Sequence, residues 1–132
     1  MTRAHSVKML VAALLAATTF LATIASAQPE GKVLRHVVLF KFKEGATPQE
    51  IKKIEEAFRA LPSKIDVIRG FEWGTNVSAE KLDQGYTHCF VLTFASDQDR
   101  DTYLVHPAHK EFGNIIGSSL DKVLVVDFWA EK

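Results

Sequence analysis

Cysteine is almost absent from this sequence. Among its 132 residues only Cys89 carries a thiol, so no disulfide can form within the chain. The sequence also lacks a CxxC pair, a P-loop, a Rossmann glycine motif and a nucleophile elbow. These absences exclude a disulfide-framework domain and leave no motif that points to nucleotide binding or serine-hydrolase chemistry.

An excess of basic residues is lacking as well. Lys and Arg together number 16, and Asp and Glu also number 16. Without Arg3 and Lys8, which lie in the leader described next, 14 basic residues remain against 16 acidic ones, a net charge of −2 with histidine neutral. Because a nucleic-acid surface needs surplus Lys and Arg to neutralise phosphates, we expect no nucleic-acid partner.

The first 27 residues have the pattern of a secretory signal peptide. Arg3 and Lys8 give a basic start, residues 9–25 carry no charge, and Ala25-Ser26-Ala27 supplies small residues around a cleavage point. A membrane-spanning helix needs about 20 apolar residues, so a retained anchor is the weaker alternative. We expect cleavage after residue 27, export to the periplasm or the extracellular space, and no membrane attachment afterwards.

Removing residues 1–27 leaves 105 residues, enough for one domain spanning 28–132. Runs of β-branched and aromatic residues predict four strands, at 34–42, 67–77, 86–94 and 122–129. Capping and periodicity predict helical segments at 48–61, 97–105 and 107–116. We expect Pro62-Ser63 to end the first helix and Pro107 to separate the other two.

This order of elements predicts an α+β fold, the ferredoxin-like β-α-β-β-α-β sandwich. We expect both helical regions on one face of the sheet, and the first and third strands side by side and parallel in its centre. The other face would expose an apolar patch of Val37, Leu39, Cys89 and Val91. Pairing two such faces about a two-fold axis would bury the patch, so we expect a homodimer.

The placement of four histidines indicates a candidate site. With parallel central strands, His36 and His88 would begin those strands at the same end of the sheet and point towards the helices. The returning helix would bring His109 to the level of His88, with Tyr103 and His106 at neighbouring helical positions. Such a pocket suits general acid–base chemistry. The alternative for each histidine is a hydrogen-bonded core residue, and for His106 a helix cap.

Three segments together resemble the stress-responsive dimeric α/β-barrel (Dabb) family. They are RHVVLFKFK at 35–43, GYTH at 85–88 and YLVHPAH at 103–109. The resemblance covers about residues 34–130, essentially the whole mature domain. It implies a ferredoxin-like domain whose sheets pair into a barrel-like dimer, a dimeric α/β barrel.

The family also includes plant polyketide cyclase activity, in which a histidine–tyrosine pair promotes an aldol condensation without a cofactor. The resemblance implies His109 as the base and Tyr103 as its hydrogen-bonding partner, with His36 and His88 as pocket histidines. Phe58 stands where the cyclase has a phenolic residue, so substrate orientation does not carry over. Export also sets this chain apart from cyclases that act on carrier-bound substrates in the cytosol.

Three functions remain open on the sequence. The first is a stress-related binding module that holds a small hydrophobic or aromatic molecule. The second is a cofactor-independent enzyme of cyclase or lyase type with His109 as general base. The third is a haem or metal centre using His36, His106 and His109. Against it, no acidic residue clearly joins the cluster, and His106 and His109, three residues apart across the break at Pro107, are poorly placed to bind one metal ion together. We expect binding without a cofactor or metal.

Overall fold

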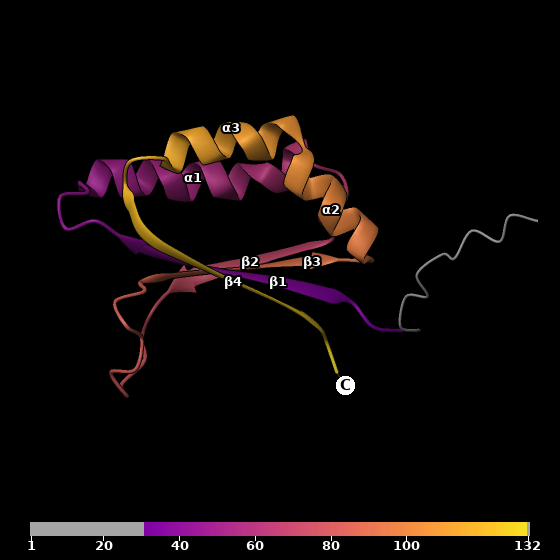
Figure 1. Ribbon diagram of the computed structural model, residues 1–132, viewed down its shortest axis with the longest axis horizontal. Coiled ribbons are helices and arrows are strands. Elements are labelled where there is room, and N and C mark those ends of the chain that lie inside the picture. Colours follow the sequence, from indigo (N-terminus) through magenta and orange to yellow (C-terminus); the bar gives the residue numbers. More distant parts are fainter. Residues whose placement is uncertain (1–30, 132) are drawn as a thin grey trace, which may run out of the picture.

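The computed structural model describes residues 31–131, so the expected signal peptide at 1–27 lies outside the described residues. The elements are β1 (Leu34–Phe42), α1 (Pro48–Lys64), β2 (Gly70–Thr75), β3 (His88–Phe94), α2 (Asp97–Val105), α3 (Pro107–Ile116) and β4 (Leu120–Trp129) (Figure 1). The α+β, ferredoxin-like β-α-β-β-α-β order is confirmed, with the second helical region in two pieces. Among residues 31–131, no helix combines the length and the apolar character needed to cross a bilayer.

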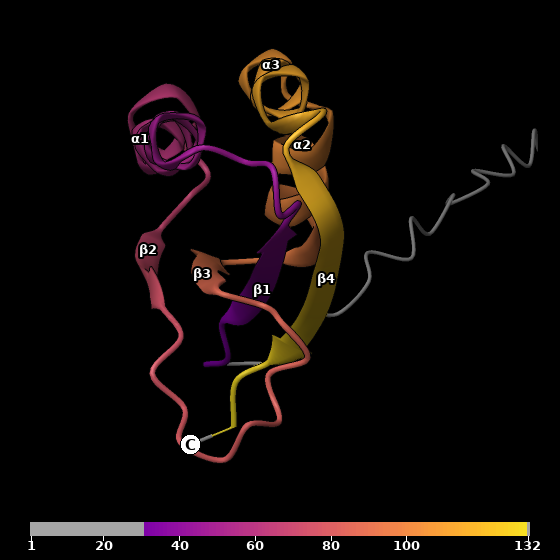
Figure 2. The same ribbon diagram turned by 90° about the vertical axis from the view of Figure 1, so that its left-hand side faces the viewer.

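The four strands form one sheet in the order β2-β3-β1-β4, and the helices all lie on one of its faces (Figure 2). The central position of β1 and β3 is as predicted, but they run antiparallel, so the expected parallel pairing was wrong. Each right-handed βαβ crossover makes the two strands that it connects run in the same direction. β1 therefore runs parallel to β2, and β3 runs parallel to β4. Because β2 and β3 are antiparallel neighbours, β1 must oppose β3.

The antiparallel register separates two of the candidate histidines. His36 lies opposite Leu92, near the end of β3, whereas His88 lies opposite Phe40, near the end of β1. They therefore occupy opposite ends of the sheet instead of the same end. Both still point towards the helices, as the alternation of the strands predicts, and both are buried.

The first helix begins as predicted and ends later. Thr47 is its N-cap and forms a capping box with Glu50. Pro62 was expected to end the helix, but the helix continues through it to Lys64. Pro62 has no N–H to donate, but it lies in the last turn, which is still closed by the Ile65 N–H donating to the Leu61 carbonyl.

A cluster of phenylalanine rings fixes the helices on the sheet. The Phe58 ring of α1 lies 4.1 Å from the Phe90 ring of β3 and 4.6 Å from the Phe112 ring of α3, centre to centre. Phe40 of β1 packs against the same three rings. Aromatic contacts of this kind stabilise the fold beyond the burial of the apolar surface alone. The four rings therefore hold α1 and α3 against each other and against the sheet.

The opposite face of the sheet has no covering layer among the described residues (Figure 2). Val37, Leu39, Cys89 and Val91 are only partly buried there. They are continued on the edge strand β4 by three side chains that are 43–49% exposed: Leu124, Val126 and Phe128. This apolar surface is the patch that the strand alternation predicted, extended by one strand.

Candidate functional site

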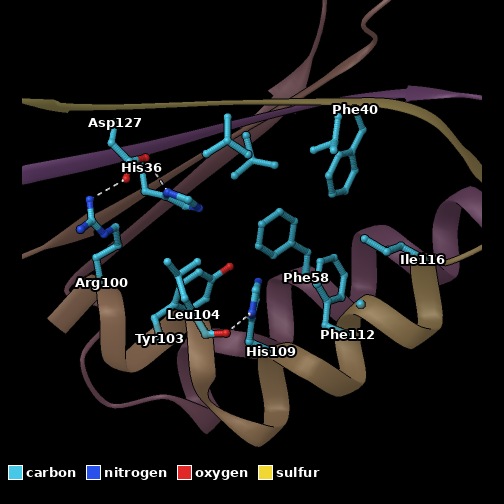
Figure 3. Close-up of a pocket in the computed structure, with 14 residues that line it drawn as sticks. His36, Phe40, Phe58, Arg100, Tyr103, Leu104, His109, Phe112, Ile116 and Asp127 are labelled. Atoms are coloured by element: carbon cyan, nitrogen blue, oxygen red, sulfur yellow. Dashed lines mark hydrogen bonds and ion pairs between the residues drawn. The ribbon is translucent and has the colours of Figure 1, made fainter. Parts of the chain in front are cut away.

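A cavity of about 430 Å³ lies between the helix-facing side of β1 and β4 and the helices α2 and α3 (Figure 3). This volume falls in the range of pockets that hold small organic molecules. One end is apolar, with Phe40, Phe58, Phe112 and Ile116, and polar side chains gather at the other. The polar set is His36, Arg100, Tyr103, His109 and Asp127.

Three of the predicted site residues meet at this polar end. His36 comes from β1, Tyr103 from α2 and His109 from α3. The Tyr103 ring lies between the two imidazoles, 5.7 Å from His36 and 4.4 Å from His109, centre to centre. Tyr103 is 1% exposed and His36 is 5% exposed. The structure thus brings together two imidazoles and one phenol from three separate elements.

His36 is held by a carboxylate. Its Nδ1 lies 2.6 Å from Oδ1 of Asp127, and because an ionised carboxylate only accepts, Nδ1–H is the donor. The second oxygen of Asp127 accepts from Nη1 of Arg100 at 3.0 Å, and Arg100 also donates to Asp101. With Nδ1 engaged, Nε2 is the nitrogen of His36 that is left for a ligand in the cavity.

His109 is held by a neutral group. Its Nδ1–H donates to the carbonyl oxygen of Leu104, with 3.0 Å between the two atoms, so in the neutral ring the lone pair is on Nε2. Burial lowers the pKa of His109, the Leu104 carbonyl opposes that change, and positive charge on His36 lowers the pKa further. His109 therefore favours the neutral form, which can accept a proton.

Tyr103 supplies a protonated hydroxyl. Burial raises the pKa of its phenol well above the ordinary value, so the group is a hydrogen-bond donor at neutral pH. The sequence predicted Tyr103 as the hydrogen-bonding partner of His109. In the structure the two rings are in contact at an angle of 46°, and the hydrogen bond that orients His109 is the one to Leu104.

His88 does not join this group, which corrects its predicted place beside His36 and His109. Its Nε2 lies 2.8 Å from Oε1 of Glu55, and its Nδ1 lies 2.8 Å from the Thr87 hydroxyl. Trp73 stacks on the ring at 6.3 Å and 13°. The antiparallel register is the reason, because it places His88 at the far end of the sheet. His88 borders instead a separate hollow of about 370 Å³ beside the β2–β3 loop.

His106 is also absent from the lining of the cavity. Its Nδ1 accepts from the backbone N–H of Ala108 at 3.1 Å, which makes it the N-cap of α3, with Pro107 in the first turn. An N-cap side chain satisfies an amide that the helix itself leaves free. The alternative of a helix cap therefore describes His106, and its predicted place in the pocket was wrong.

Sequence reasoning missed Asp127 and Arg100. The expectation that no acidic residue joins the cluster was wrong, because Asp127 lies directly opposite His36 in the pairing of β1 with β4. A signal was present: Asp127 is the one charged residue in the apolar run 123–129. Arg100 precedes Tyr103 by three residues on α2, so the two share a helix face.

Between residues 31 and 131, no group of three His, Cys, Asp or Glu side chains is arranged to hold a metal ion. His36 and Asp127 are a pair, and His109 is oriented by a backbone carbonyl. The chemistry that the described side chains themselves offer is proton transfer and hydrogen bonding.

Residues 34–130 match the family described as Stress responsive A/B Barrel Domain, Dabb. The chain belongs to this family. The Arabidopsis thaliana protein HS1, a stress-response A/B barrel domain-containing protein, is 44% identical over 95 residues, which cover 72% of this chain and 87% of HS1. Olivetolic acid cyclase from Cannabis sativa is 29% identical over 99 residues, which cover 75% of this chain and 98% of the cyclase.

Solved structures of similar chains agree with the fold. The crystal structure of At3g17210 from Arabidopsis thaliana is 42% identical, with a TM-score of 0.71, covering 75% of this chain and 96% of that one. A ferredoxin-like protein of unknown function from Bacteroides fragilis, described as dimeric, is 27% identical, with a TM-score of 0.62, covering 74% of this chain and 96% of the other. The resemblance to the Dabb family in the sequence is thereby confirmed.

Proposed function

We propose that this Dabb domain binds a small hydrophobic or aromatic molecule in the cavity between β4 and the helices α2 and α3. The observation that carries the proposal is that the residues lining the cavity separate into an apolar end and a polar end. Phenyl and aliphatic side chains form one end, and two imidazoles, a phenol and an ion pair form the other. Pockets for organic ligands combine a large apolar surface with a few polar groups that fix orientation. The description of the family as stress responsive supports a stress-related role.

Gly113 offers a direct test of binding. It lines the cavity from α3, and a Cβ built on it meets no atom within 4 Å. The Cβ of a larger residue therefore has open space, and we expect the side chain of Gly113→Leu to occupy part of the cavity. Glycine is also the poorer helix residue, so we expect no loss of stability. Gly45→Leu is a matched control, because Gly45 lies in the turn before α1 and also has open space around its Cβ.

The measurement is the change in the ¹H–¹⁵N NMR spectrum on titration with acetophenone, a neutral aromatic ketone. We expect saturable shifts of cavity residues in the wild type and in Gly45→Leu, and at least a tenfold weaker response in Gly113→Leu. Equal responses in all three proteins would place the binding elsewhere and would reject the cavity as the site.

The second candidate function is enzymatic, a proton transfer of cyclase or lyase type without a cofactor. It is favoured by the state of His109, whose lowered pKa and hydrogen bond to Leu104 leave a free lone pair on Nε2 in a largely apolar cavity. The similarity to olivetolic acid cyclase supports an activity of this type. His109→Ala should abolish turnover and keep the fold. In a binding module the same change would alter affinity alone.

We infer that the domain works as a homodimer joined through the open face of the sheet. The partly buried Val37, Leu39, Cys89 and Val91 support this, as does the dimeric description of the Bacteroides fragilis relative. Val91→Asp would place an unpaired carboxylate in an apolar interface, a cost of about 3–5 kcal/mol. Light scattering should find a dimer for the wild type and a monomer for the variant. A monomeric wild type at micromolar concentration would reject the interface.

We also propose that the protein is exported after removal of residues 1–27. The support is the basic, apolar and Ala-Ser-Ala pattern of the leader. Intact mass of protein recovered from the periplasm or the medium should correspond to a chain that starts at Gln28. Recovery of chains that keep Met1 would contradict export by cleavage.

A further inference from the structure

The loop between β2 and β3, residues 76–87, lies on the side of the sheet away from the helices (Figure 1 and Figure 2). We call this loop the arm. Its Val77 and Leu82 are the two most exposed large hydrophobic residues of the described chain, at 93% and 72%. Leu82 borders the same hollow as Leu39 and Cys89 of the open face. The apolar surface of the sheet therefore continues onto the arm, and a continuous apolar surface of this kind marks an interaction site.

The arm is held in shape by Asp83. Its Oδ1 accepts from the backbone N–H of Gly85 at 2.8 Å, and its Oδ2 accepts from Nδ2 of Asn76 at 2.9 Å. Its carbonyl oxygen accepts from the N–H of Tyr86 at 3.0 Å. The two ends of the arm are also joined, since the N–H of Asn76 donates to the Thr87 carbonyl. A loop ordered in advance loses little conformational entropy when it binds a partner.

A hollow of about 370 Å³ lies between the arm and the open face of the sheet. At the β2 edge its floor is Gly74, where a Cβ would meet no atom within 4 Å. The strand pairing places four residues in one row across the sheet, which are Gly74, Cys89, Leu39 and Leu124. The row has no side chain at the β2 edge, whereas at the β4 edge Leu124 is 43% exposed.

A second row, towards the other end of β2, has the same asymmetry. It runs from Gly70 on β2 through Thr93 and Arg35 to Phe128 on β4, and Phe128 is 48% exposed. Glu72, between the two glycines, is exposed on the edge strand, where its long side chain can keep the carboxylate in water. The open face is therefore low along β2 and raised along β4.

A second copy related by a two-fold axis can face this sheet in two simple ways. With the axis parallel to the strands, β4 of each copy lies over β2 of the other, so Leu124 and Phe128 meet the positions of Gly74 and Gly70. With the axis across the strands, β4 lies over β4, large side chains meet large ones, and the hollow remains empty. Because specific interfaces pack as closely as protein interiors, the first arrangement fits the surface.

We propose that the arm clasps a second copy of this chain, with β4 of that copy seated in the hollow between the arm and β2. The inference rests on the homodimer proposed above and names how its two copies fit together. Val77 and Leu82 contact the second copy from the side, beyond the face of the sheet. Because of the two-fold axis, each copy gives one arm and receives the other.

The first measurement is the dissociation constant of the dimer, by sedimentation equilibrium of the purified protein. Val77→Glu and Leu82→Glu each place a carboxylate in an apolar contact and should raise the constant by about tenfold or more. Val105→Glu is the matched control, because Val105 is 66% exposed but lies on α2, on the helix side of the sheet. It should leave the constant as in the wild type. An unchanged constant in both arm variants would overturn the clasp.

The second measurement tests which strands face each other. Gly74→Leu should fill the hollow and weaken the dimer, whereas Gly45→Leu, in the turn before α1, should not. In the double variant, Leu124→Ala makes room for the new leucine, so the dimer should be tighter than that of Gly74→Leu alone. Within one copy the two positions are three strand spacings apart, about 14 Å, too far to couple directly. Purely additive effects would overturn the placement of β4 over β2.

The outcomes separate this inference from the proposed homodimer. A monomeric wild type would overturn both. A dimer that is broken by Val91→Asp but keeps its affinity in Val77→Glu and Leu82→Glu would overturn the arm and leave the homodimer in place.

Discussion

Two buried histidines on the same side of the sheet differ in their surroundings, because one is enclosed by packed side chains and the other borders the cavity. His36 and His88 are 5% and 7% exposed, both face the helices, and both meet a carboxylate. His88 has partners on both nitrogens and lies under Trp73, whereas His36 has Nε2 at the wall of a cavity. Residue type and burial are shared, so neither distinguishes a structural histidine from a functional one.

The layer above each histidine accounts for the difference. Glu55, the partner of His88, belongs to the unbroken 17-residue helix α1, which packs directly on the sheet through Phe58. The chain above His36 is broken at Pro107 into α2 and α3. Figure 1 shows that α2 and α3 meet at an angle. The cavity lies between these two short helices and the strands β1 and β4.

The largest expected effect comes from removing a packed side chain at the end of the sheet that holds His88. Phe90→Ala should cost about 3–5 kcal/mol of the free energy of unfolding, as expected for a buried phenylalanine, because Phe90 is fully buried and packs against Phe58, Trp73 and His88. Val125→Ala, at a half-exposed position in the cavity wall, should cost about 1 kcal/mol or less. Urea unfolding measures both. Similar losses would mean that the two ends are equally packed.

A smaller effect distinguishes the histidines themselves. His88→Gln should lower the free energy of unfolding by about 1–3 kcal/mol, since Glu55 and Thr87 lose a buried partner. His36→Gln should cost less, because Asp127 keeps its ion pair with Arg100. Acetophenone binding should respond in the reverse order, changing with His36 and not with His88. A variant His88→Gln with altered binding would contradict the contrast.

The smallest expected effect concerns pH. The pKa of His109 is lowered in the folded state, so in the window below the unfolded value of about 6.5 the unfolded chain binds more protons than the folded one. The contribution of His109 to stability is therefore complete above that value and decreases as the pH falls through the window. In urea unfolding from pH 7.5 to 5, His109→Gln should lose less stability than the wild type. Parallel curves would show that burial does not perturb His109.

Much of the fold follows from the local sequence. The capping box at Thr47, the N-cap at Ser96 and the Pro107 start of α3 are short-range signals, and each is present in the structure. The prediction that Pro62 ends α1 was wrong, because the last turn continues to Lys64 and is closed by the Ile65 N–H.

The candidate site depends on distant pairing, and there prediction was incomplete. Tyr103 and His109 are six residues apart on adjoining helices, so the sequence could bring them together. The hydrogen bond of His36 with Asp127 joins residues 91 positions apart, and it requires the direction and register of β1 against β4. With β1 and β3 taken as parallel, His88 was placed at the wrong end. The correct strand direction follows from the crossover rule, whereas the exact register does not.

The edge strand β4 serves both sides of the molecule through alternate residues. Val123, Val125 and Asp127 line the cavity, while Leu124, Val126 and Phe128 lie on the open face of the sheet. A shift of this one strand therefore changes both surfaces together. In a dimer formed through that face, a ligand that shifts β4 would therefore link subunit association to ligand occupancy. By reciprocity, whatever a ligand adds to the affinity between subunits, association adds equally to the affinity for the ligand.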